Sequence, residues 1–154
     1  MDNFFHNPIA LLFVSYAIGA SLTPMLQKTA WYKREISKNY LSDKTTNNLG
    51  VLLLGKIIIA TSLRYFNQNL YLKGRPKKED LLKIKQVMHD AEIGHLIGFY
   101  VLLLLCLIYI FLGKDWRLIL GIFIMNIILN LYLVFLQQYN KRRVNRLLKI
   151  FEKE

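Results

Sequence analysis

The sequence predicts an all-α fold, an integral membrane bundle of three to four membrane helices with interfacial amphipathic helices. The chain has 154 residues, enough for a single domain over 1–154. It is 54% hydrophobic, and its apolar residues are gathered into long runs. The Lys and Arg residues that give the net charge of +11 flank those runs. This placement follows the positive-inside rule and favours contacts with anionic lipid or phosphate groups. We therefore expect no nucleic acid partner.

Three apolar runs are long enough to cross a bilayer as helices. They cover about residues 8–26, 94–113 and 117–137, and about 20 helical residues span the roughly 30 Å of hydrocarbon. The sequence GKDW between the last two runs is short enough to predict an antiparallel hairpin, and Trp116 is typical of an interfacial anchor.

The segment 49–66 is apolar but differs from the three runs. Lys56 lies near its middle and Arg64 near its end. Its length suits an interfacial or re-entrant helix, and a fourth span stays open because a bundle interior can hold a snorkelling Lys.

Charge placement favours three spans over four. If 49–66 does not cross, three basic clusters fall on one membrane side, which the positive-inside rule prefers. We therefore expect a multi-pass protein of the inner (cytoplasmic) membrane with its N-terminus outside and its C-terminus in the cytoplasm. The clusters contain five, six and six Lys or Arg residues and cover Lys28–Lys44, Lys73–Lys85 and Lys141–Lys153.

Two further helices are expected on the basic side. From Lys77 onward the chain is predicted to be one helix that enters the bilayer near Glu92, with Glu79 and Asp80 favourable in its first turn. Residues 141–154 are predicted to form a basic amphipathic tail. The apolar face of that tail contains Val144, Leu147, Leu148 and Phe151.

The stretch HDAEIGHLIGF, which begins at His89, carries the first candidate site. His89, Glu92 and His95 follow one another at i, i+3 spacing, whereas Asp90 points elsewhere. Ionisable groups at a membrane edge usually face a bundle interior with a partner. Glu92 and His95 therefore suggest an acid–base pair in which the carboxylate fixes the imidazole tautomer. A solvated helix end and half of a di-metal site are the alternatives, and we expect no metal because the Glu-x-x-His element occurs once.

A second set of polar residues follows the last span. Asn126, Asn130, Gln137 and Asn140 fall close to one helical face, where hydrogen bonding between helices is the alternative role. Arg142 and Arg143 follow on the same membrane side as the first candidate site. They suit a phosphate or carboxylate, or simply mark the cytoplasmic end of the span.

Two elements together resemble the glycosyl-diaponeurosporenoate acyltransferases of the staphyloxanthin pathway. AEIGH, which ends at His95, is similar to an A-E-x-x-H element that precedes an apolar hairpin in that family. QQYNKRRVNRLLKI, which begins at Gln137, is similar to a Q-x-Y-N-x-x-R-type element that leads into a basic tail. The resemblance covers roughly the C-terminal half of the chain and is weak in the first half.

The resemblance implies transfer of an acyl group from an acyl thioester to a hydroxyl of a glycosylated lipid or terpenoid acceptor. His95 would deprotonate the hydroxyl, and Glu92 would orient His95. Acyl-CoA is the expected co-substrate, with membrane lipids and a lipid-borne acceptor as partners and no cofactor. The family elements suggest substrate binding by Gln137, Tyr139, Asn140 and Arg143. Asn130 and Arg64 are further predicted binding residues from their polar character and position.

Within that set, Tyr139 or Asn140 would donate to the developing oxyanion, and Arg143 would bind the phosphates of the acyl donor.

Two other interpretations remain open. A chain this short can be a non-enzymatic membrane subunit or lipid-binding scaffold that needs a homo-oligomer or a partner membrane protein. It can also be another lipid-modifying or metal-dependent membrane enzyme. The residues do not determine the acceptor, the acyl chain or whether His89 joins the site.

Overall fold

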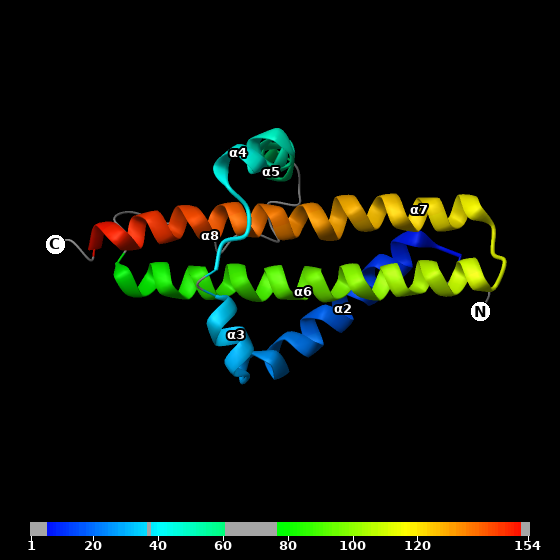
Figure 1. Cartoon of the computed structure of the whole chain (residues 1–154), viewed down its shortest axis with the longest axis horizontal. Coiled ribbons are helices and arrows are strands. Elements are labelled where there is room, and N and C mark those ends of the chain that lie inside the picture. The colour runs from blue at the N-terminus through cyan, green and yellow to red at the C-terminus, as the bar shows by residue number, and fades with distance from the viewer. Residues whose placement is uncertain (1–5, 37, 61–76, 152–154) are drawn as a thin grey trace.

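The computed structural model describes residues 6–36, 38–60 and 77–151, and every regular element in these ranges is helical. The predicted all-α membrane bundle is confirmed. Two long helical rods lie side by side as a hairpin, and α2 crosses one of them obliquely (Figure 1). The elements are α2 (Pro8–Gln27), α3 (Ala30–Glu35), α4 (Asp43–Asn48), α5 (Val51–Ala60), α6 (Lys78–Phe111), α7 (Trp116–Asn126), the π-helical turn η2 (Ile127–Leu131) and α8 (Tyr132–Phe151).

Three helices in the described ranges are long and apolar enough to cross a membrane. They are α2, α6 and the continuous rod from α7 through η2 to α8. Their outer faces carry large exposed apolar side chains, which a bilayer would cover. Examples on these faces are Ile9, Phe13, Leu104, Ile110, Phe111, Leu120 and Ile124.

The two hairpin helices extend beyond the predicted spans. They have 34 and 36 residues, about 50 Å at 1.5 Å per residue, whereas the hydrocarbon core is about 30 Å thick. The basic ends of α6 and α8 therefore project from the bilayer as a helix pair. The tail that was predicted at 141–154 continues α8 as far as Phe151, and two of its apolar residues pack against α6. These contacts join Val144 and Leu148 to Leu81 and Met88.

Local sequence sets the ends of the hairpin helices. At the start of α6 the Lys77 backbone N–H donates to the Asp80 carboxylate at 3.3 Å. Beyond the end of α6, Gly113 has a φ of 62°, a left-handed conformation that glycine adopts without strain. Asp115 then accepts from the Arg117 N–H at 2.9 Å and caps α7.

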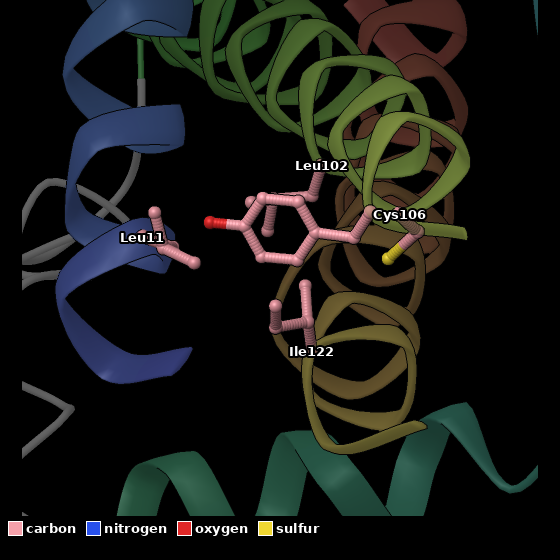
Figure 2. Close-up of a cluster of buried hydrophobic side chains, with 5 residues drawn as sticks. Leu11, Leu102, Cys106 and Ile122 are labelled. Atoms are coloured by element: carbon pink, nitrogen blue, oxygen red, sulfur yellow. The ribbon is translucent and has the colours of Figure 1, made fainter. Parts of the chain in front are cut away.

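An apolar core joins the three spans at the end of the bundle that contains the α6–α7 turn. Leu11 of α2, Leu102 and Cys106 of α6 and Ile122 of α7 converge there (Figure 2). Tyr109 completes this cluster of buried residues. Cys106 is a free cysteine that is buried in this core.

The α2–α6 crossing depends on small residues. A Cβ atom on Gly19 would lie 2.1 Å from the Gly94 carbonyl oxygen, so the two backbones meet there directly. Ser15 and Thr23 flank Gly19 at four-residue spacing, and Gly98 follows Gly94 in the same way. Such small-xxx-small patterns let membrane helices approach closely.

We expect Gly19→Ala to destabilise the bundle, because the added methyl group must push the α2 backbone away from α6. Overpacking of this kind costs about 1–3 kcal/mol. Thermal unfolding in detergent micelles would measure the loss. Gly121→Ala is the matched control, since a Cβ there has only an ordinary contact with Pro8 at 3.9 Å. Equal unfolding temperatures for the two variants would contradict the close crossing.

The segment expected at 49–66 forms α5 over Val51–Ala60, and its residues 61–66 lie outside the described residues. The ten described residues of α5 extend about 15 Å. Val51 is fully buried and packs with Leu136 of α8. Figure 1 shows α5 nearly end-on, across the direction of the hairpin, which fits an interfacial position.

Candidate functional site

A buried ion pair joins α6 to α8 close to the predicted membrane edge. The Lys141 Nζ lies 2.7 Å from the Glu92 Oε2, and the two residues are 0% and 5% exposed. The Gln138 side-chain amide donates to the second carboxylate oxygen of Glu92. Both carboxylate oxygens therefore have partners, as a buried charge requires.

His89 lies against this pair. Its Nδ1 is 3.4 Å from the Glu92 Oε2 and 3.4 Å from the Lys141 Nζ. The ring of Tyr32 from α3 covers it, with ring centroids 4.6 Å apart. In the part of the chain that the structure describes, the buried Nε2 of His89 has no hydrogen-bond partner. His89 thus joins the Glu92 cluster, the question that the sequence left open.

Asp90 faces away from this cluster, as its spacing predicted. It accepts hydrogen bonds from the Tyr32 hydroxyl and from the Gln27 side-chain amide, the latter at 2.9 Å. Burial, and then the hydrogen bond to Asp90, raise the pKa of Tyr32 above its ordinary value. The phenol therefore stays protonated as a donor, and it ties α3 to α6.

The segment that leads into α4 runs across the hairpin (Figure 1). The Tyr40 N–H donates to the Gln138 Oε1 at 3.0 Å, so the same glutamine holds both the segment and Glu92. Arg142 donates to the Leu41 carbonyl oxygen and forms an ion pair with Asp43 at 2.8 Å. Through these contacts the backbone of this segment lies against α8 beside the Glu92–Lys141 ion pair.

A second polar chain begins at a backbone carbonyl deeper in the bundle. The Asn126 amide donates to the Phe99 carbonyl oxygen at 3.0 Å, and the Asn130 amide donates to the Asn126 Oδ1 at 2.9 Å. The Asn130 Oδ1 then lies 3.3 Å from the Nδ1 of His95. Because a carbonyl oxygen only accepts, this chain places the proton of a neutral His95 on Nδ1. The Nε2 of His95 keeps its lone pair.

Two local features make this chain possible. Asn130 lies in η2, and π-helical turns of this kind occur frequently at functional sites. A Cβ on Gly98 would come within 3.1 Å of the Asn130 Oδ1, so the missing side chain leaves room for the amide. The ring of Tyr16 from α2 lies beside His95, with centroids 5.7 Å apart, and His95 itself is half-buried.

The expected pairing of Glu92 with His95 is wrong. Glu92 turns toward Lys141 and Gln138, and Asn130 holds the Nδ1 of His95. Helical spacing brings Glu92 and His95 near each other, but the opposing helix supplies better partners for each. The sequence reasoning missed Gln138 and Lys141, because Lys141 looked like one more flanking charge of a basic tail.

The other candidate residues lie in different surroundings. Gln137 is buried, and its Oε1 has no hydrogen-bond partner among the described residues. Tyr139 lies about 14 Å along the rod from Asn130, with the Arg143 guanidinium 5.8 Å from its ring centroid. Asn140 is half-buried beside it in sequence. Tyr139 and Asn140 therefore do not meet His95, and Arg64 lies outside the described residues.

The described ranges 6–36, 38–60 and 77–151 hold no group of three or more His, Cys, Asp or Glu side chains that could bind a metal ion. The site contains a base with a fixed tautomer and a buried ion pair, which suits proton transfer.

The fold and this site define a multi-pass helical membrane protein with a polar centre inside its bundle. The family model for glycosyl-4,4'-diaponeurosporenoate acyltransferase matches residues 27–150. The chain therefore belongs to this family and is an acyltransferase of carotenoid biosynthesis. The match confirms the resemblance and extends it back to residue 27, into the half of the chain where the motifs were weak. No curated protein and no solved structure matches the chain.

Proposed function

We propose that the protein transfers an acyl group from an acyl thioester to a hydroxyl of a glycosylated lipid or terpenoid acceptor. The observation that carries this proposal is the hydrogen-bond chain from Phe99 to His95, which leaves the Nε2 of His95 as a proton acceptor. Family membership supplies the acyl transfer. The exposed apolar faces of the bundle suit an acceptor that arrives from the bilayer.

In this mechanism the acceptor hydroxyl attacks the thioester carbonyl carbon while the Nε2 of His95 takes its proton. The tetrahedral intermediate then collapses, the carbon–sulfur bond breaks, and the imidazolium returns the proton to the leaving thiolate. The products are an ester and a free thiol. A positioned base of this kind contributes about 10²–10⁴-fold to the rate.

The remaining candidate residues act around that base. Asn130 is a positioning residue, because it holds the tautomer of His95. Glu92 positions the helices through Lys141, Gln138 and His89. The Oε1 of Gln137, which has no partner among the described residues, is an acceptor for a sugar hydroxyl.

Further along the rod, Tyr139, Asn140 and Arg143 are positioned for the polar part of a substrate at the membrane surface. Since Tyr139 and Asn140 lie far from His95, we do not assign them to the oxyanion.

We also propose an orientation in the inner (cytoplasmic) membrane. The start of α2 and the end of α8 lie at opposite ends of the hairpin, and the end of α8 lies beside the basic start of α6 (Figure 1). The positive-inside rule assigns that basic end to the cytoplasm and the N-terminus to the outside.

The proposal is tested by stoichiometry with the purified full-length protein in lipid nanodiscs. With an acyl-CoA and a glycosylated terpenoid acceptor, we expect equal amounts of free thiol and new ester. Omitting the acceptor should abolish thiol release. Thiol release without an acceptor would indicate a thioesterase, and no product over several chain lengths would favour a non-enzymatic subunit.

A further inference from the structure

A basic cleft of about 420 Å³ lies between the start of α6 and the end of α8, apart from the site described above. It is the space between two helices that project from the bilayer. Five cationic side chains line it. They are Lys78 and Lys85 from α6 and Arg142, Arg146 and Lys149 from α8.

Contacts with α4 hold the two arginines on the α8 side of this cleft. Asp43 accepts from Arg142 at 2.8 Å and from Arg146 at 3.2 Å. One carboxylate is shared by both guanidinium groups, and the exposed Lys78 and Lys149 add two further positive charges, so the described lining of the cleft has a positive excess. A cluster of cations is suited to an anion with several phosphates.

The depth of the cleft favours a ligand that comes from water. Measured along α6 from Phe111, the hydrocarbon core of about 30 Å ends near Glu92. Headgroups add roughly 5–7 Å on each side. Lys85 and Lys78 lie about 10 and 20 Å beyond Glu92, so they stand outside the headgroup layer. A lipid phosphate would have to leave that layer to reach them.

The cleft also lies in line with the proposed base. Lys85 and His95 are about 15 Å apart along α6, and Arg142 is adjacent to the buried Lys141. A donor with its phosphates in the cleft and a flexible arm directed along the helices would bring its thioester toward His95. Coenzyme A has this form, with three phosphates at one end and a pantetheine arm that ends in the sulfur.

We infer that the cleft between α6 and α8 binds the phosphate groups of an acyl-coenzyme A donor. This inference rests on the proposed function for its acyl group, but the phosphate contacts are testable without turnover. It assigns donor phosphates to the lysines at the ends of the two helices. Of the two arginines that the sequence suggested for a phosphate, Arg142 lines the cleft and Arg143 does not.

The first experiment measures binding of coenzyme A itself to the full-length protein by calorimetry, in nanodiscs of uncharged phosphatidylcholine. We expect Lys78→Glu/Lys149→Glu to weaken the affinity about tenfold or more. Lys28→Glu/Lys33→Glu changes the net charge equally on exposed residues outside the cleft and should leave the affinity unaltered. Equal affinities in all three proteins, or no binding by the wild type, would overturn the inference.

The second experiment measures donor preference, with acyl-CoA and the matching acyl-pantetheine as donors. The cleft variant should lose about tenfold of the wild-type preference for acyl-CoA, and the control variant should keep it. Turnover of acyl-pantetheine tests acyl transfer by itself, so a failure of the proposed function is distinguishable from a failure of the cleft.

Two further outcomes would overturn the inference. One is an effect of the cleft variant that appears only when anionic phosphatidylglycerol is added to the nanodiscs, which would identify a lipid headgroup. The other is turnover with acyl carrier protein but not with acyl-CoA.

Discussion

Replacing His95 by Ala is expected to lower kcat by about 10²–10⁴-fold, the usual contribution of a positioned general base. The protein should still fold, because His95 is half-buried. Its hydrogen bond to Asn130 is the last in the series that starts at the Phe99 carbonyl oxygen, so the other bonds of that series remain. The measurement is acceptor-dependent thiol release at equal protein level in nanodiscs. His6→Ala removes an imidazole far from the site and should retain wild-type activity.

The asparagine chain offers a further check on the same base. Asn130→Leu should lower kcat, because the Nδ1 proton of His95 then lacks its acceptor. Adding Asn130→Leu to His95→Ala should cost little more, since residues that act as one unit are not additive. A full additional loss in the double variant would show that Asn130 acts independently of His95, and full activity in His95→Ala would refute the mechanism.

Replacing Lys141 by Met is expected to destabilise the protein by about 3–5 kcal/mol, because Glu92 then remains as a buried charge without its cation. Lys141 is completely buried, and its Nζ lies 2.7 Å from the carboxylate. Thermal unfolding in detergent would measure the loss. Lys149→Met removes an exposed lysine from the same helix and should have a small effect.

The partner of Lys141 supplies the decisive control. Combining Lys141→Met with Glu92→Leu removes both charges, and buried ion pairs replaced by apolar residues are often neutral or stabilising. The double variant should therefore recover most of the lost stability. If it is as unstable as Lys141→Met, the ion pair is not the reason for the effect.

Much of the fold was predictable because the bilayer imposes simple rules on a sequence. The runs at 8–26, 94–113 and 117–137 are apolar at spanning length, and the short GKDW turn leaves the last two no arrangement other than a hairpin. The Lys- and Arg-rich segments that flank these runs indicated which end of the hairpin projects from the bilayer. The π-helical turn at η2 had no recognisable signal, since its residues continue an ordinary apolar run.

The sequence indicated several residues of the candidate site, but it did not indicate which of them contact one another. The spacing of His89, Glu92 and His95 indicated a polar face on one helix, and their partners had to come from α8. Lys141 and Arg142 look alike in the sequence. The register of α8 against α6 buries Lys141 beside Glu92 and leaves Arg142 to α4.

The sequence by itself determined the spans, the hairpin, the basic side and the family motifs, because each follows from local composition or from short patterns. Tertiary structure alone decided that Asn130 holds His95 and that Lys141 neutralises Glu92. The physical reason is that a buried charge or polar group must find its partner across the helix interface, and helix packing determines which side chain that is.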